Sequence, residues 1–244
     1  EESIAIQIWK RYWDDFYIEI ENPSGERYVV PKGEGIYEFK STDELIYVYV
    51  GTATPYSYNS EILIQIIPDN VYVKSGIWQI MFYPDSIKDG KIDLWISGRT
   101  MLTGQTGFTS AVPETTLTIP STSYRVITVG AYNGRTFSYA PFSGRGNTKN
   151  LVTVKPDISA PGVDISAPYP GGGYRLASGT SVAAPFVTGA AAILMEWGIV
   201  KGNDFFMYGE RLKAKLIKDS IQNNGQNIWP NRLLGWGLLC LKII

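Results

Sequence analysis

The stretch RLASGTSVAAPFVTGAAAILMEW, residues 175–197, decides the fold of the C-terminal part of this chain. It places Ser181 after a Gly-Thr pair and at the start of an alanine-rich run that is typical of a helix. The first N–H groups of a helix have no intrahelical acceptor and carry partial positive charge, so they can stabilise an oxyanion. Ser181, which can also donate its own N–H, is therefore a candidate nucleophile, and Gly179 and Thr180 are its supporting residues.

The same residues also have a simpler structural explanation. Serine and threonine are common helix N-caps, and helices of small residues are common in tight α/β cores. The spacing is not that of the Gly-x-Ser-x-Gly elbow, because Ala183 stands where the second glycine would be. We expect Pro185 in the first helical turn and close packing at Gly189. The residues alone leave both explanations open.

A nucleophilic serine needs a base to take its proton. The chain contains no histidine, the side chain that most often does this. Asp157 and Asp164 lie in glycine- and proline-rich segments, where carboxylates commonly cap turns. We therefore expect both aspartates to be turn caps and assign no aspartate of this chain to a catalytic triad.

Four stretches resemble the subtilisin-like serine peptidases. SGTSVAAPFVTGAAAIL (178–194) is similar to the active-site serine motif, with Val182 and Phe186 where the family often has Met and His. The other three are IPSTSYRVITVGAYN (119–133), FSYAPFSGRGNTKNLVTVKPDISAPGVDI (137–165) and LLGWGLL (233–239). The resemblance covers residues 114–244. It implies an α/β fold, with a mostly parallel sheet and helices, and peptide-bond hydrolysis through an acyl-enzyme on Ser181.

In this family the triad runs Asp, His, Ser along the chain, and an oxyanion Asn also precedes the serine segment. The resemblance therefore implies that the missing Asp, His and Asn lie upstream of Glu1, that this chain is a C-terminal portion, and that the portion alone is inactive. The implied partners are a protein or peptide substrate and the missing N-terminal half of the catalytic domain. Calcium occurs in the family, but no acidic cluster here has convincing ligand spacing, so no calcium site is assigned and calcium binding stays open; no other cofactor is expected.

Residues 1–113 have a different texture. Short runs rich in Ile, Val, Tyr and Trp, ending in turn residues and without intervening helices, predict an all-β jelly roll or sandwich ahead of residues 114–244. The predicted strands lie within 2–11, 14–23, 35–41, 44–51, 60–69, 76–85 and 90–98. Subtilases with a jelly roll inserted at this point include the clostridial Csp group, which activates a spore-cortex lytic enzyme during germination. GIWQIMFYP and DGKIDLWISG resemble that group.

The later part is predicted to contain fewer elements. A buried strand is expected at Val126–Val129, ending at Gly130, followed by polar, glycine-rich loops as far as Gly162. A first helix starts near residue 180. A second is expected over 204–222, with an apolar stripe made of Phe205, Phe206, Leu212, Leu216 and Ile217.

Composition limits the function classes. A net charge of -1 without a Lys/Arg cluster argues against a nucleic-acid surface, and no run is expected to reach membrane-spanning length. Two alternatives to a peptidase stay open. One is a pseudoprotease that uses the fold for binding or regulation. The other is a ligand-binding module, for example for a glycan, in residues 1–113, where core packing explains the same aromatic side chains.

Overall fold

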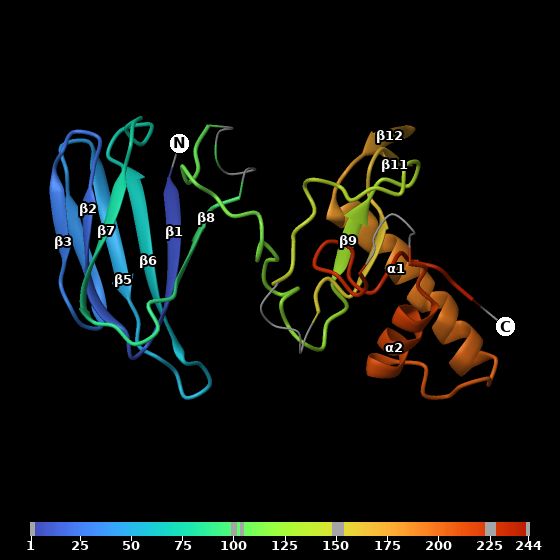
Figure 1. Cartoon of the computed structure of the whole chain (residues 1–244). Coiled ribbons are helices and arrows are strands. Elements are labelled where there is room, and N and C mark those ends of the chain that lie inside the picture. The colour runs from blue at the N-terminus through green and yellow to red at the C-terminus, as the bar shows by residue number, and fades with distance from the viewer. Residues whose placement is uncertain (1–2, 99–101, 103–104, 148–153, 223–227, 243–244) are drawn as a thin grey trace. The chain divides into compact units, whose positions relative to one another are not determined.

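The computed structural model describes residues 3–98, 102, 105–147, 154–222 and 228–242, and Figure 1 draws its helices and strands. Contacts within the chain divide it into two compact units, Glu1–Ala111 and Val112–Ile244. The buried apolar side chains form separate clusters in the two units. Each unit therefore has a core of its own.

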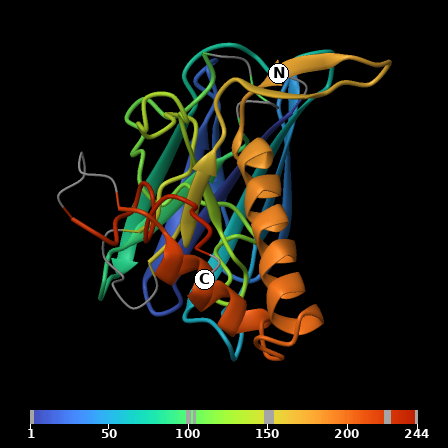
Figure 2. The same ribbon diagram turned by 90° about the vertical axis from the view of Figure 1, so that its right-hand side faces the viewer.

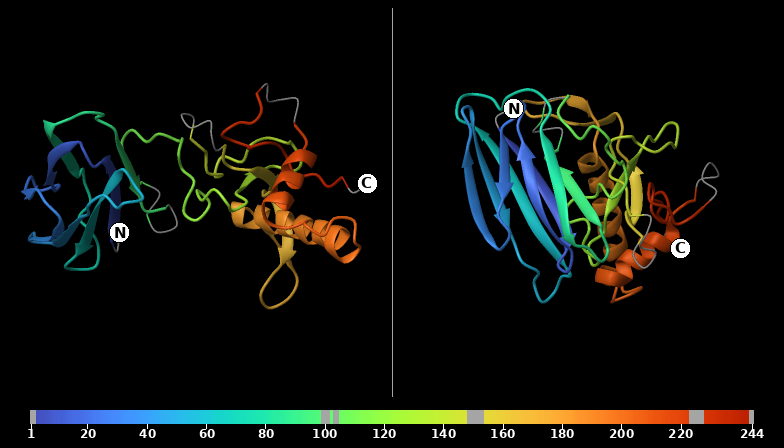
Figure 3. Two further views of the ribbon diagram at one scale, coloured as in Figure 1. Left: turned by 90° about the horizontal axis from the view of Figure 1, so that it is seen from below. Right: turned by 60° about the vertical axis from the view of Figure 1, so that its left-hand side comes forward.

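The N-terminal unit consists of two antiparallel sheets. One has the strand order β4-β5-β6-β1-β8 and the other β3-β2-β7. The right-hand view of Figure 3 shows these strands. Their bounds are β1 Ile4–Arg11, β2 Asp15–Glu21, β3 Arg27–Val30, β4 Gly35–Lys40, β5 Glu44–Val50, β6 Asn59–Pro68, β7 Gln79–Ser86 and β8 Ile92–Ile96. All the predicted runs contain a strand. Strand β3, which is only four residues long, was not predicted.

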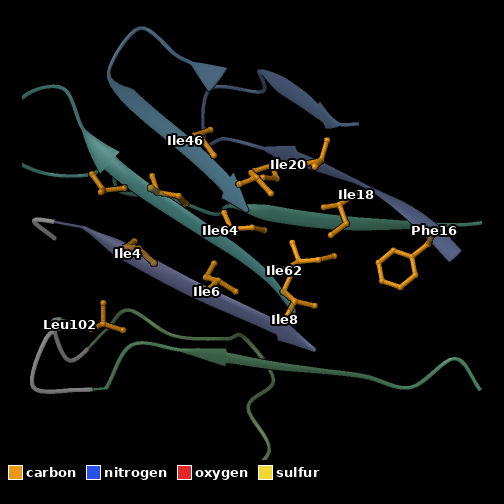
Figure 4. Packing of buried hydrophobic residues seen from close by; sticks show 14 residues of the cluster. Ile4, Ile6, Ile8, Phe16, Ile18, Ile20, Ile46, Ile62, Ile64 and Leu102 are labelled. Atoms are coloured by element: carbon orange, nitrogen blue, oxygen red, sulfur yellow. The ribbon is translucent and has the colours of Figure 1, made fainter. Parts of the chain in front are cut away.

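The core of this unit lies between the two sheets. Side chains on a strand alternate between its faces, so every second residue of a half-buried strand is apolar. Figure 4 shows the resulting rows of isoleucines facing one another. The rows are Ile4, Ile6 and Ile8 on β1, Ile62, Ile64 and Ile66 on β6, and Phe16, Ile18 and Ile20 on β2.

The C-terminal unit mixes short strands with helices (Figure 2). Strands β9 (Val129–Tyr132) and β10 (Ile158–Pro161) pair in parallel, and β11 (Ile165–Pro168) pairs with β12 (Tyr174–Ala177) as a hairpin. Helix α1 (Thr180–Met195) continues into a π-helical turn, η1 (Glu196–Val200), and α2 (Gly209–Asp219) follows. Helix α1 contacts both β9 and β10.

Two strand predictions were wrong here. Strand β9 begins three residues after the predicted start, and Gly130 lies inside it instead of ending it. A Cβ on Gly130 would lie 2.6 Å from Ser159 Oγ, so the glycine permits the close approach of β10. Strand β10 itself falls in a stretch that was predicted as loop. Its prolines and glycines suggested turns, but its backbone pairs with β9.

The second helix is shorter than predicted. It covers Gly209–Asp219, and Leu212 and Leu216 are buried as expected. Phe205 and Phe206 were predicted on its apolar stripe, but they precede the helix and are each 67% exposed. The helical period was therefore extended too far toward the N-terminus.

The expectation about membrane-spanning length was also wrong. The helical stretch Thr180–Val200 has 21 residues and a mean hydropathy of 1.5, so by length and composition it could cross a membrane. Core helices pass the same test. One face of α1, formed by Ala183, Val187, Ala190 and Leu194, is buried against the rest of the unit.

Candidate active site

Ser181 is the second residue of α1. The helix begins at Thr180 after the N-cap residue Gly179, and no side chain caps its N-terminus. Ser181 is exposed, and its Oγ makes no hydrogen bond with any described residue. The capping explanation is therefore wrong for this serine. Its hydroxyl is available for another role.

The N–H groups around Ser181 are arranged as donors. The N–H groups of Val182 and Ala183 both donate to the carbonyl oxygen of Gly179, at 3.1 and 3.2 Å. Those of Thr180 and Ser181 donate to no described carbonyl. Free N–H groups at a helix N-terminus are suited to an oxygen that gains negative charge. The start of α1 therefore has the local geometry that an oxyanion requires.

Two glycines hold the start of the helix against the sheet. The N–H of Gly179 donates to the carbonyl oxygen of Gly162 at 2.8 Å, and the N–H of Gly162 donates to that of Tyr132 at 3.0 Å. A Cβ on Gly162 would lie 2.8 Å from the carbonyl oxygen of Gly179. Gly179 itself has φ 157°, which favours glycine. Gly162 was not among the predicted site residues, although the Pro161-Gly162 pair lies in one of the stretches that resemble the subtilisin-like peptidases.

Two expectations about α1 were wrong. Pro185 is the sixth helical residue, not a first-turn residue, so its missing N–H leaves the carbonyl of Ser181 without its usual intrahelical donor. Gly189 was expected to allow close packing, but a Cβ there would meet nothing within 4 Å. The close packing of α1 comes from its alanines, of which Ala183 is fully buried.

Thr180 lines a cavity of about 380 Å³ within the C-terminal unit. Most of its polar lining consists of hydroxyl groups. The lining residues are Pro113, Thr116, Leu117, Thr118, Ser121, Thr128, Val129, Tyr139, Pro141, Phe142, Ser143, Gly144, Arg145 and Thr180. The cavity thus lies beside the residue that precedes Ser181, and its lining joins segments that are far apart in the sequence.

Asp157 is not a turn cap, so that expectation was wrong. Its buried carboxylate binds the ammonium groups of Lys155 and Lys213, with N–O distances of 2.6 and 2.9 Å. The N–H of Thr128 donates to the same carboxylate at 2.7 Å. Burial lowers the pKa of Lys155, while Asp157 opposes that shift. This cluster was not predicted, because Lys213 is distant from Lys155 and Asp157 in sequence.

The described contacts of Asp164 do not show a turn cap either: its N–H donates to the hydroxyl of Ser178, which is distant in sequence, at 2.9 Å, and its carboxylate lies 3.4 Å from the same hydroxyl. Among the described residues, no group of three or more His, Cys, Asp or Glu side chains could hold a metal ion. The geometry around Ser181 thus offers a hydroxyl and backbone donors.

Comparison with known proteins assigns the segment that contains Ser181 to a family. Residues 103–237, more than half of the chain, match the model of the subtilase family (Peptidase_S8). The structure of the CspB protease of Clostridium perfringens superposes with a TM-score of 0.87 at 34% identity. The match covers 98% of this chain and 50% of that one.

Curated relatives match shorter stretches. The PII-type proteinase of Lactococcus lactis subsp. cremoris is 37% identical over 86 residues, which are 35% of this chain and 4% of the relative. The minor extracellular protease Vpr of Bacillus subtilis is 30% identical over 110 residues, which are 40% and 12%. The chain thus spans a small part of these relatives and half of CspB. The family match, which includes the serine helix, shows that this chain belongs to the subtilase family of serine peptidases.

Proposed function

We propose that this chain carries the nucleophile of a serine endopeptidase and that Ser181 is that nucleophile. The observation that carries the proposal is the position of Ser181. Its unbonded, exposed hydroxyl lies at the start of α1, beside the free N–H groups of Thr180 and Ser181, in a chain of the subtilase family. Nucleophile and oxyanion donors are then supplied by the same helical turn.

The proposed reaction is acyl transfer to water. The Oγ of Ser181 attacks the carbonyl carbon of a peptide bond while a base takes its proton. The carbonyl oxygen becomes an oxyanion, which the N–H of Ser181 stabilises. The leaving amine takes the proton from the base and departs, and the acyl-enzyme on Ser181 is then hydrolysed by water.

The base has to come from outside this chain, which contains no histidine. We propose that the rest of the protein supplies the His, its orienting Asp and an oxyanion Asn, because this chain corresponds to only half of CspB. On this proposal, the isolated 244-residue chain does not hydrolyse peptide bonds. The other half of the catalytic domain is then a required partner, and the substrate is a protein or peptide.

We also propose that residues 1–113 are a jelly roll inserted into the catalytic domain, which continues as residues 114–244. Two antiparallel pairings support this topology: β1 pairs with β8, and β2 pairs with β7. The second pair therefore lies, along the chain, between the two strands of the first pair. The 98% coverage of this chain in the CspB match supports a Csp-like organisation. We therefore propose a germination role like that of the Csp group.

The test compares the full-length protein with the isolated chain, using a fluorophosphonate that labels activated serines. We expect stoichiometric labelling of Ser181 in the full-length protein and none in the isolated chain. Ser181→Ala in the full-length protein should lower kcat by about 10⁶-fold, as loss of a triad nucleophile does. Thr188→Ala, which removes an exposed hydroxyl group from the same helix, should leave kcat unchanged.

Two results would contradict the proposal in different ways. Rapid labelling of the isolated chain would show that the base lies within these residues. A folded full-length protein that neither reacts at Ser181 nor cleaves peptides would favour a pseudoprotease that uses the fold for binding.

A further inference from the structure

The N-terminal unit contains a cavity of about 420 Å³ at one end of its two sheets. It lies where β1 ends, where β2 and β6 begin, and beside the turn that follows β3. Its lining includes Lys10, Asp15, Phe16, Ile18, Lys32, Glu34 and Ile62. All belong to one unit, and none takes part in the proposed peptidase chemistry.

The inner part of this cavity is apolar. Phe16 and Ile18 come from one sheet and Ile62 from the other, and all three are buried. Figure 4 shows Phe16 at the same end of the core as Ile62 and Ile8. The cavity is therefore an extension of the core toward the end of the sheets. A hydrocarbon group placed there would contact side chains of both sheets.

One ammonium group is placed at this apolar end. Lys10 follows Ile4, Ile6 and Ile8 on the inward-facing row of β1, where the alternation would call for another apolar side chain. Its Nζ donates to the carbonyl oxygens of Asp14 and Arg11. It also lies 5.3 Å from the centre of the Phe16 ring. Lys10 is partly buried, so its charge is only partly hydrated.

No carboxylate pairs with this ammonium. Among the described residues, no carboxylate oxygen lies within 4.0 Å of Lys10 Nζ, and the carboxylates of Asp14 and Asp15 have other partners. The Asp14 carboxylate accepts the N–H groups of Lys88, Asp89 and Gly90 at 2.7–3.0 Å. That of Asp15 lies 3.8 Å from the Lys32 ammonium.

A partly buried cation without a carboxylate partner is incompletely compensated, and a ligand that supplies a carboxylate is favoured. Burial lowers the pKa of Lys10, more than the charges of Asp15 and Asp14 raise it. A carboxylate bound at Nζ would favour the charged lysine. It would also use the ammonium's remaining N–H, since two are directed to carbonyl oxygens.

We propose that this cavity binds a small apolar carboxylate, with its hydrocarbon body between Phe16, Ile18 and Ile62 and its carboxylate on Lys10. The volume is in the range of small-molecule sites. A neutral glycan fits the inner cavity less well, because its hydroxyl groups would need partners along a mostly apolar wall. The proposal does not depend on the role of Ser181.

The test uses the full 244-residue chain with isotope-labelled isoleucine methyl groups and octanoate as the probe. We expect saturable shifts of the Ile18 and Ile62 methyl signals, with no shift at Ile46 or in the C-terminal unit at Ile158. Octanol, which has the same chain without the charge, should bind roughly ten- to one-hundred-fold more weakly. Octylammonium should not bind.

Lys10→Met removes the charge at similar length and should weaken octanoate binding by roughly ten- to one-hundred-fold, while octanol binding stays unchanged. Lys10→Arg keeps the charge and should retain octanoate binding. The control is Lys40→Met, an exposed lysine on β4. The methyl spectrum reports whether each variant is folded. If Lys10→Met does not fold, the comparison of octanoate, octanol and octylammonium binding, together with Lys10→Arg, still tests the proposal.

Three results would overturn the proposal. One is equal octanoate binding by wild type and folded Lys10→Met. A second is octylammonium binding as tight as octanoate, which would point to Asp15 or Glu34. The third is the absence of any saturable shift with octanoate while a neutral oligosaccharide shifts Ile18 and Ile62, which would assign the cavity to a glycan.

Discussion

The two units of the chain differ in how completely they bury their apolar side chains. In the N-terminal unit, Ile8, Ile46 and Ile64 are fully buried between two sheets. In the C-terminal unit, α1 buries one row of small residues and leaves Phe186, Ile193 and other apolar side chains about 40% exposed. Strands in which every second residue is apolar bury those residues between the two sheets of their own unit. Helix α1, by contrast, has a second apolar face that the described residues leave uncovered.

The units also differ in how they hold a buried aspartate. Asp14 of the N-terminal unit is satisfied by three backbone N–H groups, so its negative charge needs no cation. Asp157 of the C-terminal unit is satisfied mainly by two lysine ammonium groups that are themselves buried. When the aspartate is replaced, backbone N–H donors leave no net charge without a partner, whereas lysine ammonium groups remain as buried charges without a counterion. The C-terminal unit should therefore be the more sensitive to loss of its aspartate.

The largest expected effect on stability comes from Asp157→Asn. Two buried ammonium groups lose their counterion, so the free energy of unfolding of the C-terminal unit should fall by about 3–5 kcal/mol. Hydrogen exchange of peptides from 154–222 measures this separately from the other unit. Asp93→Asn, which breaks the exposed pair with Lys91, is the control and should cost less than about 1 kcal/mol. Equal losses of stability in Asp157→Asn and Asp93→Asn would contradict this contrast between a buried and an exposed ion pair.

Truncation of the isoleucine core should have the next largest effect. Ile64→Ala leaves a cavity between two sheets and should lower the free energy of unfolding of the N-terminal unit by about 2–5 kcal/mol. Denaturant-dependent hydrogen exchange of peptides from β1 and β6 is the measurement. Ile36→Ala, at a side chain that is 74% exposed, should change it by less than about 0.5 kcal/mol. Protection lost in the C-terminal unit instead would mean that the cores are coupled.

Two glycine substitutions should have opposite signs. Gly130→Ala places a Cβ 2.6 Å from Ser159 Oγ and should cost about 1–3 kcal/mol, because β9 and β10 must separate. Gly189→Ala meets nothing within 4 Å inside a helix and should stabilise by about 0.5–1 kcal/mol. Thermal unfolding of both variants measures the difference. A destabilised Gly189→Ala variant would show that something covers this position.

The smallest effect is a dependence on pH. Burial raises the pKa of Asp14, but N–H donors from Asp89, Lys88 and Gly90 outweigh it, so the net pKa is below the ordinary value of 3.8. Because the folded-state pKa lies below the unfolded-state pKa, ionised Asp14 adds stability at pH values above the unfolded-state pKa. This stability is lost as the pH falls through the folded-state pKa. Asp14→Asn should flatten this acid loss in urea unfolding followed by circular dichroism. Parallel curves for wild type and variant would contradict it.

The sequence predicted most strands of the N-terminal unit because their alternation is local. The row Ile4, Ile6, Ile8 is visible without any partner strand. Strand β10 could not be predicted in that way. Its residues Ile158–Pro161 have neither alternation nor length, and their extended backbone depends on pairing with β9. Short parallel strands take their structure from contacts distant in sequence.

The candidate site was predictable only in part. The Gly-Thr-Ser stretch is contiguous, so the sequence alone placed Ser181 at the start of a helix. The cluster around Asp157 was not predictable, because Lys213 reaches it from α2. Lys10 was missed for another reason: it continues an apolar row, and the cavity beside it is formed by segments that are distant in sequence.

The hairpin β11–β12 has a consequence for variation along this chain. Its tip consists of Gly171, Gly172 and Gly173, all with positive φ, and a Cβ on any of them would meet nothing within 4 Å. Gly162 and Gly179, by contrast, admit no larger side chain without moving the serine or its neighbours. We therefore expect insertions, or an added reporter, to be tolerated better at this tip than at the two glycines that lie close to Ser181.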